Sequence, residues 1–319
     1  MTTDPQSDLR DLLRAELVAS VEPQIVAIAD AARARYGDHA CAVLFYGSCL
    51  RRGYQDDDVV DLYLVVDRYA HGSVSRLAAF LNWLLPPNVV YVEASFHGAT
   101  VRAKCAVISL LDFERGASGR WFHSYLWARF AQPCRLAYVR DGDVTKRLLD
   151  ALQGAVETMV GEVRPLMTMP YDSTALWGMA LAETYRAELR AERQGQASAL
   201  VGGDPERYAK VSALLCEAGA LETLGGVNGS GPLYRPDAST AQRLAARFRW
   251  FLRRIAGKIL SVLRLMKAAF TFDDGAVYIL WKIERHSGVS VALSDWQRRH
   301  PILASTTLFW RLYRKGAFK

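Results

Sequence analysis

Residues 42–48 read Ala-Val-Leu-Phe-Tyr-Gly-Ser, and residues 59–66 read Val-Val-Asp-Leu-Tyr-Leu-Val-Val. A polar turn with three consecutive aspartates, residues 56–58, separates the two apolar runs. Short runs rich in β-branched and aromatic residues, bounded by turn residues, are typical of buried strands. We therefore expect a strand that ends in a Gly-Ser turn, followed by a second strand whose one carboxylate is Asp61.

The Gly-Ser turn and Asp61 have the residue types of a nucleotide site. Gly47 permits close approach of the backbone to a phosphate, backbone N–H groups in such a turn bind anions, and the Ser48 hydroxyl can donate to a phosphate oxygen. Asp61 can hold a divalent cation that is also bound by a triphosphate. This layout is typical of nucleotidyltransferases, although a turn without a ligand is an equally open interpretation of the local pattern.

Many nucleotidyltransferases place two metal ligands on one face of a strand as Asp-x-Asp. Side chains alternate along a strand, so the partner of Asp61 would be residue 59 or 63, and these are Val59 and Tyr63. Asp58, at the start of the strand, is a further candidate metal ligand. We expect Asp56 and Asp57 to be solvated turn residues.

Composition narrows the class of protein. The chain has 319 residues, 51% of them apolar, which is enough for two domains with buried cores. Its five cysteines are scattered without a Cys-x-x-Cys pair, so neither a zinc ribbon nor a disulfide framework is indicated. The net charge of +7 favours an anionic partner. We expect a cytoplasmic protein, peripheral on the inner face of the membrane, with no signal peptide or transmembrane helix.

The order of apolar patterns predicts an α/β part followed by a helical part. Strands are expected at 42–48, 59–66, 89–96 and 101–111, with helices at 8–36, 73–85 and 121–131. Beyond residue 141 we expect helices at 145–159, 173–193 and 210–224, a loop at 194–205 and a linker at 225–237. These patterns predict a nucleotidyltransferase domain with a mixed sheet at 1–145, a helical, winged-helix-like domain at 146–235, and a basic amphipathic region at 236–319.

The stretch 243–270 combines eight cationic residues and no acidic residue with apolar residues at helical spacing. One interpretation is a helix whose apolar face enters an anionic membrane surface, with its cations attracted to the lipid headgroups. The other is a helix that packs its apolar stripe on the core and leaves a solvated basic face. Basic and aromatic residues could also bind single-stranded nucleic acid, but no motif supports this, and no nucleic acid partner is expected.

Several stretches together resemble the mitochondrial-type phosphatidate cytidylyltransferases, the translocator-maintenance family within the nucleotidyltransferase superfamily. The matching stretches, in chain order, are Tyr46-Gly47-Ser48-Cys49, the strand around Asp61, Ala103-Lys104-Cys105-Ala106-Val107-Ile108-Ser109, the segment from Trp121 through Ala128-Arg129 to Pro133, Tyr185 to Arg190, and Lys210-Val211. They cover about residues 42–215. The chain departs from the family pattern at Cys49, Ala106, Gln132 and Glu188.

The resemblance implies a reaction of CTP with phosphatidic acid that gives CDP-diacylglycerol and pyrophosphate, with Mg²⁺. It implies that Asp61 holds the metal and that Tyr46, Gly47 and Ser48 hold the nucleotide's phosphates. The same resemblance makes Lys104, Arg129 and Arg190 cationic phosphate ligands. It suggests Glu188 as a further metal ligand or anchor, with Asp58 and Glu93 as weaker candidates, and Lys210 as a cofactor-binding residue.

Two other functions are compatible with the residues. One is a nucleotidyltransferase with a different acceptor, such as a small molecule, a protein or an RNA end. The other is a scaffold that binds nucleotide or lipid without catalysis, since the second carboxylate of Asp-x-Asp is missing.

Overall fold

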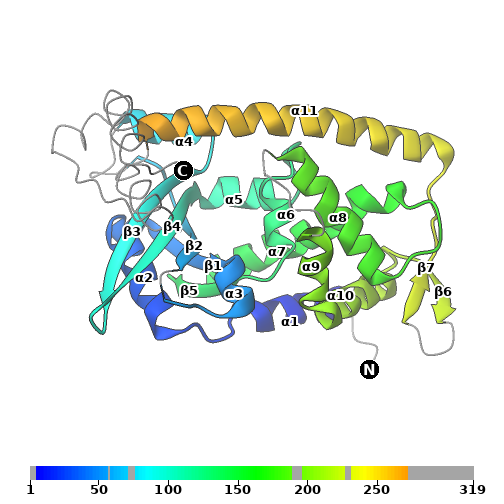
Figure 1. The fold of residues 1–319 in the computed structure, drawn as a ribbon, viewed down its shortest axis with the longest axis horizontal. Coiled ribbons are helices and arrows are strands. Elements are labelled where there is room, and N and C mark those ends of the chain that lie inside the picture. The colour runs from blue at the N-terminus through cyan, green and yellow to red at the C-terminus, as the bar shows by residue number, and fades with distance from the viewer. Residues whose placement is uncertain (1–4, 57, 71–75, 189–195, 227–230, 272–319) are drawn as a thin grey trace, which may run out of the picture.

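A mixed sheet of five strands forms one side of the molecule (Figure 1). The computed structural model describes residues 5–56, 58–70, 76–188, 196–226 and 231–271. The strands are β1 (Ala40–Tyr46), β2 (Val59–Val66), β3 (Asn88–Phe96), β4 (Ala99–Ser109) and β5 (Arg135–Val139), in the spatial order β3-β4-β2-β1-β5. The β2–β4 pair is parallel, and the other pairs are antiparallel. The prediction of a mixed sheet flanked by helices is confirmed.

Both faces of the sheet are covered, which explains the nearly continuous apolar sequence of β2. On one face, Val60, Leu62 and Leu64 pack in a cluster with Ile25 and Ile28 of α2 (Pro23–Ala34). On the other face, Tyr63 and Val65 belong to a larger cluster that continues into the helices. Because side chains alternate along β2, consecutive residues belong to two different cores, one on each face of the sheet.

Helices make up most of the remaining described chain. They are α1 (Pro5–Leu17), α3 (Ser48–Arg52), α4 (Arg76–Leu84), α5 (Leu110–Ala117), α6 (Trp127–Phe130), α7 (Gly142–Val163), α8 (Ser173–Ala187), α9 (Gln196–Gly202), α10 (Pro205–Glu217) and α11 (Thr240–Thr271). Short 3₁₀ turns lie at Gly37–His39 and Arg164–Leu166, and the small hairpin of β6 (Thr223–Gly226) and β7 (Pro232–Tyr234) precedes α11.

Some predicted elements were wrong in type or length. The predicted strand 101–111 ends at Ser109, because the Ser109 hydroxyl accepts a hydrogen bond from the Asp112 N–H and caps α5. The predicted helix 121–131 is helical only over α6. The segment 135–139 forms β5 by pairing with β1, a long-range contact that a local pattern does not indicate.

The region after residue 190 also differs from its predicted loops. The predicted loop 194–205 contains α9, and the predicted linker 225–237 contains β7 and the end of β6. The α1 helix, assigned by sequence to the first domain, packs on α7 and α10. A single hydrophobic cluster extends from Leu9 in α1 to Trp250 in α11, so the helical part and one face of the sheet share a core.

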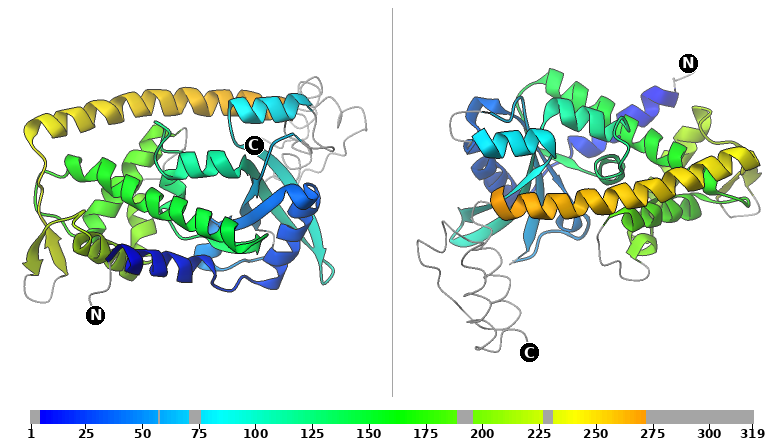
Figure 2. Two further views of the ribbon diagram at one scale, coloured as in Figure 1. Left: turned by 180° about the vertical axis from the view of Figure 1, so that it is seen from behind. Right: turned by 90° about the horizontal axis from the view of Figure 1, so that it is seen from above.

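The long helix α11 runs along one side of the molecule, and α4 lies beside its C-terminal part both in Figure 1 and in the view from above in Figure 2. Its face toward the protein has Ala246, Trp250 and Arg253, all buried. At Gly257 it crosses so close to the end of α8 that a Cβ would lie 2.2 Å from the Ala187 carbonyl oxygen.

The apolar stripe of α11 is exposed, so the interpretation in which this stripe packs on the core was wrong. The exposed apolar row of α11 comprises Leu244, Phe248, Phe251, Leu252, Ile255, Ile259, Val262 and Leu263. A second exposed row on α4 comprises Leu77, Phe80, Trp83 and Leu84. Residues 272–319 of the predicted third region lie outside the described part of the chain.

Candidate functional site

A row of polar residues crosses the sheet on the face of Tyr63 and Val65, whose core continues into the helical part. Tyr46 of β1 is paired with Asp61 of β2, Asp61 with Lys104 of β4, and Lys104 with Tyr91 of β3. Residues that are paired across strands project from the same face of a sheet. The structure thus brings together Tyr46, Asp61 and Lys104, which the sequence had separated by up to 58 positions.

Gly47 brings the turn against the Asp61 carboxylate. Its φ is +89°, a region that favours glycine, and a Cβ at this position would lie 2.6 Å from Asp61 Oδ2. The turn therefore requires glycine for two reasons: its backbone conformation, and the lack of space for a Cβ beside the Asp61 carboxylate. Ser48 follows as the first residue of α3 and is exposed.

Cys49, at a position where the related pattern has glycine, is a packing residue. It is buried, and its Sγ lies 3.7 Å from the Val59 carbonyl oxygen. Burial, together with the nearby carboxylates of Asp58 and Asp61, raises the pKa of this thiol to about 11. A thiol that stays protonated is a poor nucleophile, so Cys49 contributes shape rather than reactivity.

Asp58 and Glu93, two candidate metal ligands, are engaged elsewhere. Asp58 accepts hydrogen bonds from Arg52 Nη2 at 2.7 Å and from the Gln55 N–H at 2.9 Å, which closes the turn before β2. Glu93 accepts from the Tyr91 hydroxyl at 2.8 Å, and one of its oxygens lies 3.4 Å from Arg102 Nε. Donors in the turn thus engage both oxygens of Asp58, and Tyr91 and Arg102 lie at Oε1 of Glu93.

Arg129 of α6 lies over the aromatic side chains that surround the polar row. Its Nη1 donates to the Tyr63 hydroxyl at 2.9 Å, and its guanidinium carbon lies 5.4 Å from the Tyr46 ring centre. Burial disfavours the charge, but the oxygens of Tyr63, Tyr46 and Tyr125 and the Glu188 carboxylate hold the pKa of Arg129 well above its usual range. Arg129 is therefore a fixed positive charge beside the strand that presents Asp61.

A second guanidinium group shares an aromatic ring with Arg129. The Tyr125 ring centre lies 4.7 Å from the Arg129 guanidinium carbon and 4.1 Å from that of Arg264 in α11. Burial raises the pKa of the Tyr125 hydroxyl, but the two guanidinium groups outweigh burial and lower it. The sequence pattern placed Arg264 among the basic residues of an amphipathic helix and did not predict this position.

Glu188 lies where the end of α8 meets this cluster. Its carboxylate acts electrostatically on Tyr125, Arg129 and Arg264. The sequence suggested Glu188 as a metal ligand or an anchor, and in the structure its carboxylate offsets part of the charge of these two arginines.

Two predicted site residues remain, Lys210 and Arg190. Lys210 is exposed on α10, whose buried face is formed by Tyr208, Val211 and Leu215 among others. Among the described residues, no hydrogen bond or ion pair is recorded that joins Lys210 to the polar row. Arg190 lies outside the described residues.

Two basic residues of α11 anchor this helix to the backbone of residues 85–87, just before β3. Lys267 donates to the carbonyl oxygens of Leu85 and Pro87, and Arg264 Nε donates to the Pro86 carbonyl oxygen at 3.3 Å. Burial and the charge of Arg264 lower the pKa of Lys267 to about 7. Burial and the charges of Arg264 and Arg253 lower the pKa of His123 to about 3, so this imidazole is neutral at physiological pH.

The donor set suits a metal that arrives with its substrate. Within the described residues, no group of three or more His, Cys, Asp or Glu side chains could hold a metal by itself. Mg²⁺ bound to nucleotides commonly takes one or two protein carboxylates and completes its coordination with phosphate oxygens and water. Asp61, with a glycine turn that leaves room only because it has no Cβ, fits this mode.

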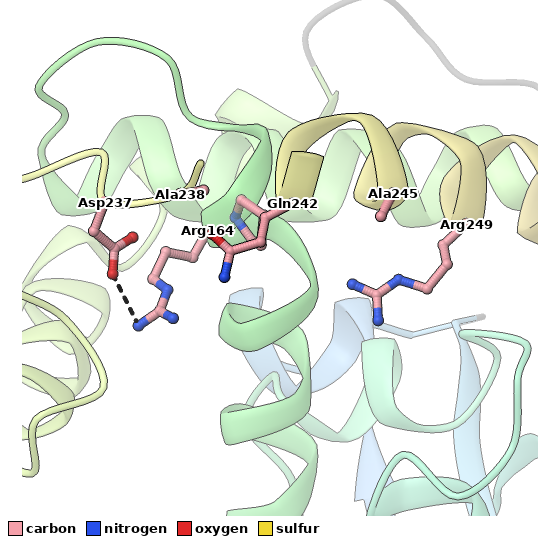
Figure 3. A pocket seen from close by; sticks show the side chains of 7 residues that line it. Arg164, Asp237, Ala238, Gln242, Ala245 and Arg249 are labelled. Atoms are coloured by element: carbon pink, nitrogen blue, oxygen red, sulfur yellow. Dashed lines mark ion pairs between the residues drawn. The ribbon is translucent and has the colours of Figure 1, made fainter. Parts of the chain in front are cut away.

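Two pockets among the described residues can be compared with the predicted site. One, of about 300 Å³, lies where the start of α11 passes Arg164, with Asp237, Gln242 and Arg249 on its wall and the Arg164–Asp237 ion pair at 3.5 Å (Figure 3). It contains no predicted site residue. The other, of about 690 Å³, begins at Leu50, Arg51 and Arg52 of α3, directly after the turn, and extends to Tyr208 of α10.

The residues that sequence reasoning missed had weak local signals. Tyr63 was noted only as the position where a second aspartate was absent, although alternation already placed it on the face of Asp61. Tyr125 belonged to a segment predicted as one helix, and Arg264 had to be assigned to a helix face that the sequence alone left open.

No family model matches the chain, and no curated protein matches it. The described part of the chain contains no helix that is both long enough and apolar enough to cross a bilayer.

Proposed function

We propose that the protein is a nucleotidyltransferase, specifically a phosphatidate cytidylyltransferase that forms CDP-diacylglycerol and pyrophosphate from CTP and phosphatidic acid with Mg²⁺. The observation that carries the proposal is the polar row of Tyr46, Asp61 and Lys104, closed on one side by the Gly47 turn. A carboxylate for a cation and a cationic side chain for phosphate oxygens stand side by side there. The choice of CTP and phosphatidic acid rests on the sequence resemblance.

In the proposed reaction, an oxygen of the phosphatidate monoester attacks the α-phosphorus of CTP. The new P–O bond forms as the bond from the α-phosphorus to the bridging oxygen breaks, and pyrophosphate leaves with the electron pair. Bound Mg²⁺ would neutralise charge on the triphosphate. A phosphate monoester is already anionic near neutral pH, so the reaction needs no strong general base.

The chain's own residues would position the substrates and neutralise the negative charge of their phosphates. Asp61 would hold the cation, and Gly47 and Ser48 would bind the β- and γ-phosphates through the turn. Lys104 and Arg129 would compensate negative charge. The 690 Å³ pocket that begins directly after this turn offers room for the rest of the nucleotide.

Association with a membrane surface is part of the proposal, with its physical basis revised. The exposed apolar rows of α11 and α4 suit insertion into the interface of a bilayer. However, Arg253, Arg254 and Arg264 each donate a hydrogen bond to another part of the protein. Attraction to anionic headgroups would therefore come from exposed residues such as Arg247 and Lys258, fewer than the eight cations that the sequence suggested.

The decisive experiment measures pyrophosphate release from purified protein with Mg²⁺ and CTP, with and without phosphatidic acid vesicles. We expect release only with the lipid, and loss of at least about 100-fold in Asp61→Asn, since the variant keeps the shape and removes the charge. Asp56→Asn, an exposed aspartate in the turn before β2, is the matched control and should keep full activity.

The other outcomes discriminate between the alternatives. Release without lipid, still dependent on Asp61, would indicate a nucleotidyltransferase with another acceptor. Absence of release with every nucleoside triphosphate, together with CTP binding that does not depend on Mg²⁺, would reject catalysis and favour a binding scaffold.

A further inference from the structure

A series of neighbouring residues leads from the polar row to the exposed row of α11. Asp61 and Tyr63 lie on one face of β2, Tyr63 accepts a hydrogen bond from Arg129, and Arg129 and Arg264 share the ring of Tyr125. Arg264 directly follows Val262 and Leu263, which are exposed. The series thus runs from the proposed metal ligand to the apolar side of the helix.

Arg264 is held in place with donor capacity to spare. Its Nε donates to the Pro86 carbonyl oxygen at 3.3 Å, and its guanidinium plane lies over Tyr125. Its buried Nη2 has no hydrogen-bond partner among the described residues. A buried guanidinium nitrogen without a partner is costly, and a phosphate oxygen is a ligand that would satisfy it.

The charges around Arg264 favour an anion. Arg129 and Arg264 act on each other electrostatically, which lowers the pKa of Arg264 in addition to the effect of burial. Glu188 offsets part of this charge, and Arg253 is paired with Glu162 at 3.1 Å. His123 and Lys267 adjoin the same cluster, and both have lowered pKa values, so their positive charge is disfavoured there.

We propose that Arg264, together with Arg129 across the ring of Tyr125, binds the phosphate monoester of the acceptor lipid. The helix that offers its apolar row to the bilayer would then also deliver the lipid headgroup to the polar row. The proposal rests on the proposed function for the identity of the acceptor. It adds a residue, Arg264, and a place for the acceptor between α6 and α11.

The test uses the full chain and dihexanoyl phosphatidic acid, which needs no vesicle. In Arg264→Gln we expect the KM for this lipid to rise about 10- to 100-fold, the effect of losing charge-assisted hydrogen bonds, while the affinity for CTP with Mg²⁺ stays within twofold. Arg264→Lys should recover part of the loss, because it restores the charge without the bidentate fork. Arg14→Gln, an exposed arginine of α1 with no part in the proposed sites, is the matched control.

Two results would overturn the proposal. One is a KM within twofold of the unsubstituted protein in Arg264→Gln, when a melting curve shows that the variant is folded. The other is an equal affinity for glycerol 3-phosphate and dihexanoyl phosphatidic acid, which would assign the site to a free phosphate monoester instead of a lipid.

A binding measurement separates this proposal from the proposed function. If the unsubstituted protein releases no pyrophosphate, titration calorimetry with dihexanoyl phosphatidic acid still compares it with Arg264→Gln. Binding that falls at least 10-fold in the variant would support the phosphate site while the catalytic proposal fails. Equal binding, or none, would reject the site itself.

Discussion

The two longest helices in the described part of the chain, α7 and α11, have similar amphipathic sequences but turn opposite faces inward. In α7, Leu148, Leu152 and Val156 are buried in the main core. In α11, the corresponding apolar stripe is exposed, and Arg253 and Lys267 are among the buried side chains. The periodicity of a helix shows that two faces differ, but the partners of each face decide which one turns inward.

The partners of α11 explain its orientation. Arg253 Nε donates to the Phe122 carbonyl oxygen at 2.7 Å, and its Nη1 donates to Glu162 at 3.1 Å. The guanidinium group also lies 4.7 Å from the Trp250 ring centre. These groups pay the cost of burying the charge, which an apolar core could not do.

The largest effect is expected where α11 buries its charge. Arg253→Ala should lower the free energy of unfolding by about 3–5 kcal/mol, because Glu162 and the Phe122 carbonyl lose a buried donor. Arg247→Ala, on the exposed side of the same helix, should change it by no more than about 0.5 kcal/mol. Urea denaturation of both variants measures the difference, and equal effects would refute the inward orientation of Arg253.

A matched pair of leucines tests the orientation of the apolar faces. Leu148→Ala in α7 should cost about 2–5 kcal/mol of unfolding free energy, because it leaves a cavity in a fully buried site. Leu244→Ala in α11, where the side chain is 59% exposed, should cost about 0.5 kcal/mol or less. A cost for Leu244→Ala comparable to that of Leu148→Ala would show that this end of the α11 row is covered in solution.

The exposed row of α11 should matter for membrane binding more than for stability. Replacing Phe248, Ile255 and Ile259 by serine should weaken binding to phosphatidic acid vesicles by at least about 10-fold, since each lost side chain removes about 1.5 kcal/mol or more of possible burial. The melting temperature should change little. Vesicle sedimentation measures the binding, with Arg247→Gln as a control expected to lose less, and unchanged sedimentation would exclude the row as the contact surface.

A smaller effect concerns the acid stability of the contact between α11 and the segment before α6. The pKa of His123 is about 3 in the folded protein against 6.5 for the free side chain, so the unfolded state binds more protons between these values. The buried neutral His123 therefore does not lower the free energy of unfolding above pH 6.5, and this free energy decreases as the pH falls from 6.5 toward 3. When the pH is lowered from 7 to 5, the free energy of unfolding of His123→Gln should therefore fall by about 1–2 kcal/mol less than that of the unsubstituted protein.

Denaturation at the two pH values measures this difference. His97→Asn, at an exposed turn with φ of +49°, serves as the control, because asparagine tolerates this conformation. If His123→Gln and His97→Asn show the same pH dependence, His123 is not neutral in the folded protein.

The sequence by itself determined the strands around the Gly-Ser turn and the position of Asp61. These features are local, because an apolar run and a glycine needed for a positive φ and a close approach are visible in neighbouring residues. It also determined that the middle of the chain is mostly helical, and the resemblance pointed to Lys104, Arg129 and Glu188. Those three residues do lie on the sheet face or in the helical layer that covers it.

Only the tertiary structure decided which groups meet across distant segments. The pairing of β2 with β4 places Lys104 beside Asp61, and the hydrogen bonds of Asp58 within its own turn engage both of its oxygens. Above all, the orientation of α11 depends on the Glu162 carboxylate and on the carbonyl oxygens that its cations find. Such partners come from chain segments far away, and the helical period of α11 contains no information about them.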